Sequence, residues 1–192
     1  MNNQTMTAPT STAPFTLELE KLKICSFLSE ETTAYEAILR INGIPAIRAH
    51  NEGHGGCDCF DPIYNPRTKQ CEHALFKTAM EAVEAHLATL PDIVCDITEK
   101  DGSKFSYRPS LETLVGDKIA AAEKAKTVEK LVKSMKDRII FLEGGKLWKT
   151  GKVAGISSKL LARFQAKNPK AKIFNSLPVE DARNQLLASG LV

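Results

Sequence analysis

The chain has 192 residues, of which 43% are hydrophobic and 26% charged, a composition typical of a globular protein with one substantial core or a core and a small appendage. Its longest aliphatic runs are only a few residues, whereas crossing a bilayer takes about 18 consecutive apolar residues. A membrane span is therefore excluded, and no membrane partner is expected.

The net charge of +3 combines an acidic and a basic part. Residues 1–116 have 10 Lys or Arg against 16 Asp or Glu, whereas residues 117–173 have 15 against 5. Such asymmetry is typical of a surface for nucleic acid or an acidic protein, and equally of two halves that attract each other.

Residues 1–15 are rich in Thr, Pro, Asn and Ser and lack the basic and apolar regions of a secretory signal, so a disordered tail is expected. The predicted localisation is cytoplasmic. There, the five cysteines are expected to be reduced thiols or metal ligands rather than disulfides. Cys25 and Cys95 lie in apolar runs and are expected to be small buried core residues.

Residues 16–108 are predicted to form an α+β domain on an antiparallel sheet. Asn42-Gly43 predicts a two-residue hairpin turn, because both turn positions need positive φ. A phase slip near Glu20-Lys21 indicates a bulge. Prolines then predict irregular structure, followed by a helix that Pro91 ends and by a hairpin around Asp101-Gly102. The expected ranges are 15–28, 32–41 and 44–49 for three strands, 59–69 for the irregular segment, 72–90 for the helix, and 92–98 and 104–107 for the hairpin.

Residues 109–137 are predicted to be a long amphipathic connecting helix from Ser110 to Asp137. Its apolar side includes Ala125 and Val128, opposite a lysine row. Residues 138–192 are predicted to form a small basic ββαβα unit, with Ser157 as a helix N-cap. Its elements are expected at 138–143, 146–149, 157–166, 172–175 and 178–188. The predicted fold class is therefore α+β: an N-terminal antiparallel sheet with one covering helix, the long helix, and the basic unit.

The segment between His50 and His73 holds three cysteines and three histidines, mostly beside glycines. Neutral imidazole and thiolate suit the tetrahedral preference of Zn²⁺, and a metal would hold a loop too polar to pack by itself. The expected zinc ligands are His54, Cys57, Cys59, Cys71 and His73. Their spacing is tighter than the common Cys-x2-Cys pair, and a glycine-rich ordered loop with incidental cysteines is the alternative.

A catalytic interpretation of the same loop takes Cys57 as a nucleophile and His54 or His73 as its base, in a metal-dependent hydrolase or a cysteine-nucleophile enzyme. A further interpretation is phosphate binding by the loop amides. No acidic or amide partner for the histidine is identifiable in the sequence, and no catalytic residue is assigned.

The basic half predicts a surface for nucleic acid or an acidic partner. Its lysines and arginine recur at helical spacing, and the single tryptophan lies among lysines, where it is placed to stack on an unpaired base. The residues of this predicted surface are Lys126, Lys130, Lys133, Trp148, Lys159, Arg163 and Lys167. The alternative is a solvated lysine face and a core tryptophan.

Two stretches together resemble a family of small uncharacterised proteins of phages, prophages and plasmids. The first is Ser29-Glu30-Glu31-Thr32 with the following strand, the Asn42-Gly43 turn and the loop Asn51-x-Gly53-His54-Gly55-Gly56. The second is the hairpin from Phe141 to Trp148 with the following helix and strand. The resemblance spans most of residues 16–175, transfers no known activity, and implies that His54 and the glycines carry any shared role of the loop, as a contact for a ligand or partner.

The function expected from these features is non-enzymatic. The chain is predicted to be an accessory protein of a mobile genetic element that binds a host protein or a nucleoprotein target, with a role against host defence as one form of that activity. DNA or RNA binding and loop-centred catalysis are the two alternatives.

Overall fold

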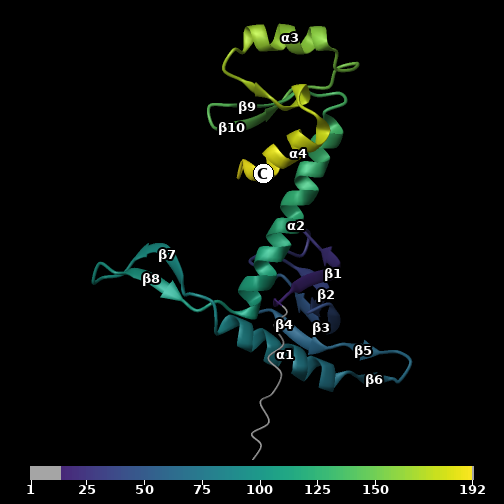
Figure 1. The fold of residues 1–192 in the computed structure, drawn as a ribbon, viewed down its shortest axis with the longest axis vertical. Helices are drawn as coiled ribbons and strands as arrows, with labels where there is room; N and C mark the ends of the chain where they lie inside the picture. The colour runs from purple at the N-terminus through teal and green to yellow at the C-terminus, as the bar shows by residue number, and fades with distance from the viewer. Residues whose placement is uncertain (1–13, 192) are drawn as a thin grey trace, which may run out of the picture. The chain divides into compact units, whose positions relative to one another are not determined.

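The computed structural model describes residues 14–191 and has an α+β fold with an N-terminal antiparallel sheet (Figure 1). The chain forms two compact units, Met1–Lys118 and Ile119–Val192, here called the N-terminal and C-terminal units. Most of the predicted tail lies outside the described residues. Within them, the Phe15 ring stacks on His86 with centroids 4.1 Å apart.

The N-terminal unit contains a four-stranded antiparallel sheet in the order β1-β2-β3-β4. The bulge is confirmed: the register shifts between Glu20 and Lys23, and Lys21 has φ of 55°. The hairpin turn is also confirmed, since Asn42 and Gly43 both have positive φ. Alternate side chains on the strands are buried, as a half-buried sheet requires. The strands are β1 (Leu17–Ile24), β2 (Tyr35–Ile41), β3 (Ile44–Asn51) and β4 (Cys59–Pro62).

The expectation of irregular structure over residues 59–69 is wrong for its first part. β4 pairs with β3, with Cys59 opposite His50 and Pro62 opposite Ile47. An edge strand tolerates a proline at its end because the missing N–H is not needed for pairing. A short hairpin then follows, formed by β5 (Tyr64–Asn65) and β6 (Gln70–Cys71).

Helix α1 (His73–Leu87) covers the sheet with its buried Ala79 and Val83 and contacts β2, β3 and β4. The predicted hairpin follows as β7 (Ile93–Thr98) and β8 (Lys104–Tyr107), and Figure 1 shows it extending away from α1. The expected burial of Cys25 is wrong, because its thiol-bearing side chain is exposed beyond the end of β1, whereas Cys95 is half-buried.

Helix α2 (Leu111–Ser134) matches the predicted long helix. Leu111, Val115 and Ile119 are buried in its first half and Val128 in its second half. No side chain from residue 120 to 127 is fully buried, and Ala125, expected on the apolar side, is exposed. Among the described residues, no helix combines the length and apolar character needed to cross a membrane.

The C-terminal unit has a three-stranded antiparallel sheet in the order β10-β9-β11. One face of β9 packs with α2 and α4 around a core of Val128, Ile140, Phe174, Ala182 and Leu186. Ser157 caps α3 as predicted, since its hydroxyl accepts a 3.2 Å hydrogen bond from the Leu160 amide. The elements are β9 (Ile140–Glu143), β10 (Lys146–Lys149), α3 (Ser158–Lys167), β11 (Lys172–Ile173), the short 3-10 helix η1 (Phe174–Ser176) and α4 (Val179–Ala188).

Candidate functional site

The loop of residues 53–56, here called the Gly-His loop, is held by the segment before β2. The Gly53 carbonyl accepts hydrogen bonds from the amides of Glu30 and Glu31 at 3.0 and 3.1 Å, and from Thr32 at 3.4 Å. Gly53 has φ of 92°, and a Cβ there would lie 2.1 Å from the Leu28 carbonyl oxygen. The close approach of the two segments therefore requires glycine at this position.

Asn51 organises the loop from the end of β3. Its side chain is almost fully buried, at 8% exposure. Its Oδ1 accepts from the Thr32 hydroxyl at 2.8 Å and from the Gly53 amide at 2.8 Å. Its Nδ2 donates to the Gly56 carbonyl and to Asp58 Oδ1, both at 2.9 Å. Both ends of the amide are thus satisfied, as a buried polar group requires.

The hydrogen bonds of Asn51 form part of a network that continues through Asp58 to Tyr35 and Glu112. The Tyr35 hydroxyl donates to Asp58 Oδ2 at 2.5 Å, and the Asp58 amide donates to Glu112 Oε1 at 2.9 Å. Burial, and then the hydrogen bond to and charge of Asp58, raise the pKa of Tyr35 far above its ordinary value. Tyr35 therefore acts as a neutral donor that fixes Asp58, and the whole network orders the Gly-His loop.

The sequence assigns no site role to Asp58, Tyr35 or Glu112, and it includes Asn51 only as the first residue of the loop motif. One signal for Asn51 was available: its side chain accepts from the amide two residues later, an Asx turn that asparagine favours at the start of a loop. No comparable local signal exists for Glu112, which reaches Asp58 across 54 residues.

His54 projects outward from the loop, with Nδ1 3.3 Å from Glu30 Oε2. It lines a surface hollow of about 480 Å³ together with Lys23, Glu36, Arg48, His50 and Glu52. Nδ1 of His50 is buried without a hydrogen-bond partner among the described residues, and Asp61 Oδ2 lies 3.7 Å away. Arg48 is occupied by Glu36 at 3.0 Å, and this pairing lowers the pKa of the Glu36 carboxyl. Charged side chains of both signs therefore line the hollow, beside apolar ones such as Leu28 and Ala34.

The structure separates the predicted zinc ligands into two places. His54, Cys57 and Cys59 lie at the loop, with both cysteines exposed. β4 then leads the chain away along β3, so that Cys71 in β6 and His73 at the start of α1 lie beyond its other end. Within residues 14–191, no three His, Cys, Asp or Glu side chains are grouped to hold a metal ion. Zinc stays a prediction.

The proposed nucleophile–base pair lacks a contact in the structure. Across residues 14–191, no hydrogen bond joins Cys57 to His54 or His73, and the His54 ring faces Glu30 instead. The catalytic interpretation therefore stays a prediction.

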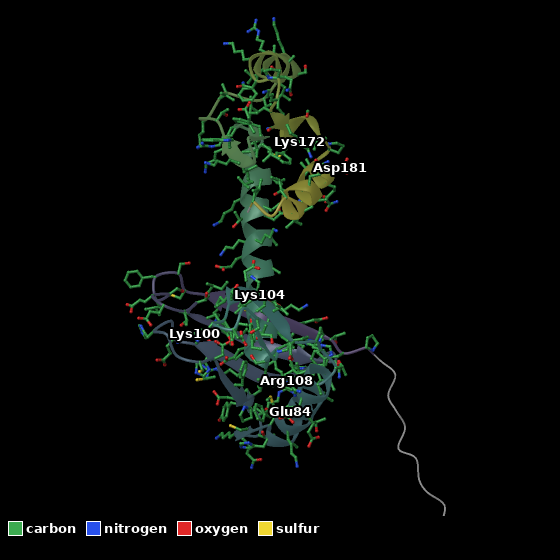
Figure 2. The ribbon with its side chains drawn as sticks, turned by 90° about the vertical axis from the view of Figure 1, so that its left-hand side faces the viewer. Glu84, Lys100, Lys104, Arg108, Lys172 and Asp181 are labelled. Carbon is green, nitrogen blue, oxygen red and sulfur yellow. The ribbon has the colours of Figure 1, made fainter. Side chains whose placement is uncertain are left out.

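The predicted basic surface residues are all exposed: Lys126, Lys130, Lys133, Trp148, Lys159, Arg163 and Lys167. Six of them form two separate rows on helices, and Trp148 lies on β10. The α2 row is Lys126, Lys130 and Lys133, and the α3 row is Lys159, Arg163 and Lys167. Figure 1 shows α3 on one side of the β10-β9-β11 sheet and α2 with α4 on the other, and in Figure 2 nitrogen-tipped side chains extend outward around α3.

Cations of the C-terminal unit are largely unpaired. The unit has 15 Lys and Arg against 6 Asp and Glu, a net charge of +9. In the described part of this unit, only Arg183 lies within ion-pair distance of carboxylates, those of Glu129 and Glu180. The rows on α2 and α3 consequently present uncompensated positive charge.

Comparison of the chain with protein-family models, with curated proteins and with solved structures found no match.

Proposed function

We propose that this protein is a non-enzymatic nucleic-acid-binding protein whose C-terminal unit contacts the phosphate backbone. The observation that carries the proposal is the exposed, unpaired positive charge of that unit. All of its lysines and arginines except Lys124, Arg138 and Arg183 are exposed. Such side chains neutralise phosphates and release condensed counterions, which supplies sequence-independent affinity.

The sheet arginines of the N-terminal unit differ from most cations of the C-terminal unit in that they are paired. Each of these arginines is neutralised by carboxylates on neighbouring strands: Arg40 lies 3.1 Å from Glu20, and Arg48 lies 3.0 Å from Glu36. A cation already held by a carboxylate has little to gain from a phosphate. The chain therefore pairs the sheet arginines of one unit and leaves the helix rows of the other unpaired, which favours an external anionic partner for the second.

The proposal is tested by the salt dependence of binding. Affinity for a fluorescent oligonucleotide is measured by anisotropy over a series of salt concentrations. Two double variants reverse the charge of the rows: Lys126→Glu with Lys130→Glu for the α2 row, and Arg163→Glu with Lys167→Glu for the α3 row. For duplex DNA, each lost phosphate contact lowers the slope of log affinity against log salt by about 0.9.

Lys77→Glu is the matched control, because Lys77 is an exposed helix lysine of the acidic N-terminal unit with Glu81 4.0 Å away. It is expected to bind like the parent protein. Absence of binding to any nucleic acid at low ionic strength would overturn the proposal and leave an acidic protein as the partner to seek. A mobile-element role and a nucleoprotein target stay predictions of the resemblance.

A further inference from the structure

Three side chains form a row across one face of the C-terminal sheet. Trp148 on β10 is paired with Phe141 on β9, which is paired in turn with Ile173 on β11. Cross-strand partners point to the same face of a sheet. Phe141 packs edge-on against Phe164 of α3, with centroids 4.9 Å apart, so this is the face that α3 covers.

The cover that α3 provides is incomplete. Ile173 is 5% exposed and Phe141 is half-buried, whereas Trp148 is 51% exposed. The helix therefore covers β11 and β9 and leaves β10 open. A core tryptophan would be buried, and this large apolar side chain instead presents half of its surface to solvent.

The one polar atom of the Trp148 ring is engaged within its own hairpin. Nε1 donates to the Glu143 carbonyl at 3.3 Å, within the same hairpin. The indole has no further donor to offer, since Nε1–H is its only one. What Trp148 presents to a ligand is therefore its aromatic surface, which suits stacking on any base rather than recognition of a particular one.

Cations lie on both β10 and α3, the two elements next to this open face, and Glu143, the cross-strand partner of Lys146, is the carboxylate on it. Lys146 precedes Trp148 by two residues on β10 and shares its face. Phe164 lines a hollow of about 600 Å³ on α3 with Leu160, Arg163, Ala166 and Lys167. From residue 138 to 173 the chain has nine Lys and Arg and a single carboxylate, Glu143. Aromatic and apolar surface is thus bordered by cations, the combination that binds single strands.

We infer that this face binds single-stranded nucleic acid, with an unpaired base stacked on Trp148 and the adjoining phosphates contacted by Lys146, Arg163 and Lys167. The inference rests on the proposed function and adds the strandedness of the ligand and the side of the unit that reads it. In a duplex the bases are stacked on each other, so Trp148 reaches none of them and only the phosphate contacts remain.

The first experiment uses the full chain and its single tryptophan. Unlabelled oligo(dT) and oligo(U) are titrated while Trp148 fluorescence is followed, beside a duplex of equal length. We expect saturable quenching by both single strands, because a stacked base quenches indole emission, and no comparable quenching by the duplex at saturation. Equal responses to single strands and duplex would overturn the inference.

The second experiment follows labelled oligo(dT) by anisotropy with Trp148→Ala and Trp148→Phe. Stacking on an aromatic side chain contributes roughly 5- to 150-fold in affinity per base, so Trp148→Ala is expected to weaken oligo(dT) binding by that factor. Trp148→Phe is expected to restore part of it. Duplex affinity is expected to change less than about 2-fold in both variants, since neither removes a phosphate contact.

Failure of this inference is distinguishable from failure of the proposed function. Binding of oligo(dT) and duplex with equal affinity, unchanged in Trp148→Ala, would remove the stacking site and leave phosphate binding intact. No binding of either would remove both. Circular dichroism of the two variants shows whether they fold, and the quenching measurement on the parent protein needs no variant.

Discussion

The Thr32 hydroxyl donates a 2.8 Å hydrogen bond to Asn51 Oδ1, and this bond joins the segment before β2 to the end of β3. Tyr35 and Asn51 are cross-strand partners on the same sheet face, so the sheet register itself delivers Asn51 to Thr32. The Gly-His loop therefore takes its shape from the sheet, and its order is coupled to the stability of the N-terminal unit.

Replacing Asn51 by Ala is expected to lower the free energy of unfolding of the N-terminal unit by about 2–4 kcal/mol. A buried polar group left without a partner costs about 1–3 kcal/mol. Asn51→Ala removes the acceptor of the Thr32 hydroxyl and the donor to the Gly56 carbonyl. Asn51→Asp is expected to be at least as damaging, because its second oxygen would face the Gly56 carbonyl and Asp58. Urea unfolding followed by circular dichroism measures both; an unchanged midpoint would show that the network carries no stability.

Glycines of the Gly-His loop differ in what they tolerate. Gly53→Ala is expected to destabilise by about 2–4 kcal/mol, because positive φ costs a non-glycine residue about 1–3 kcal/mol and the new Cβ meets the Leu28 carbonyl. Gly56 is the matched control, since its φ is not positive and no atom lies within 4 Å of a Cβ built there. Thermal unfolding of Gly56→Ala should stay close to the parent protein. Equal effects at the two positions would contradict the packing described for Gly53.

Periodicity predicts most of the elements because they carry their own signals. Tyr35 to Ile41 alternates, Asn42-Gly43 supplies positive φ, and Ser157 caps a helix. β4 has no such signal. Residues 59–62 become a strand because β3 offers them backbone partners, a tertiary effect that local sequence does not contain.

The sequence predicts where the candidate sites lie along the chain, but only some of the contacts that form them. The cluster of glycines locates the loop, but the bond between Thr32 and Asn51 spans 19 residues and depends on strand register. The separation of Cys71 from Cys57 is likewise set by β4, a strand that the sequence does not predict. On the basic unit, lysine spacing identifies the rows correctly, whereas the sheet that separates the α2 and α3 rows is a feature of the fold.

Alkaline pH is expected to remove the contribution of Tyr35 to the free energy of unfolding. Its pKa is raised in the folded protein, chiefly by burial and by Asp58, with smaller effects of Glu112 and Cys59. A raised pKa means that the neutral phenol is favoured on folding, so this stability is fully present below the ordinary tyrosine pKa of about 10 and is lost as the pH rises above it. Tyr35→Phe has no such titration.

The measurement compares urea midpoints of the parent protein and Tyr35→Phe from pH 8 to about pH 11 in reductant. Below about pH 10 the parent protein is expected to be more stable, because Tyr35→Phe leaves Asp58 Oδ2 without its donor. Above that pH the two curves are expected to converge. Parallel curves over the whole range would show that Tyr35 ionises as readily in the folded as in the unfolded chain.

The candidate zinc ligands lie in two places, so cysteine variants can distinguish which of them bind a metal ion. Any zinc bound at the Gly-His loop is expected to be lost in Cys57→Ser, Cys59→Ser and retained in Cys71→Ser. Elemental analysis of untagged protein measures this directly, with about one zinc per chain as the value for a complete site. Loss of zinc in Cys71→Ser would require the β5–β6 hairpin to fold back toward the loop.

Asn175 holds the C-terminal unit together through three hydrogen bonds. Its Oδ1 accepts from the Ile140 amide at 2.7 Å, and its Nδ2 donates to the carbonyls of Met135 and Arg138 at 2.9 and 2.8 Å. These bonds satisfy backbone groups where α2 ends and β9 begins. Asn175 lies in η1, whereas the sequence predicts a strand that continues from 172 to 175.

Replacing Asn175 by Ala is therefore expected to destabilise the C-terminal unit by about 1–3 kcal/mol, since it leaves these backbone groups without partners. Asn175→Asp retains an acceptor for Ile140 but sets a carboxylate oxygen against two carbonyls, so it should not rescue stability. Trp148, the only tryptophan, lies in the same unit and reports its unfolding in urea. The control is Asn184→Ala on the exposed side of α4, expected to stay within about 0.5 kcal/mol of the parent protein. Equal stability of the Asn175 and Asn184 variants would mean that water replaces the Asn175 side chain, and that the α2–β9 junction is held by its apolar contacts alone.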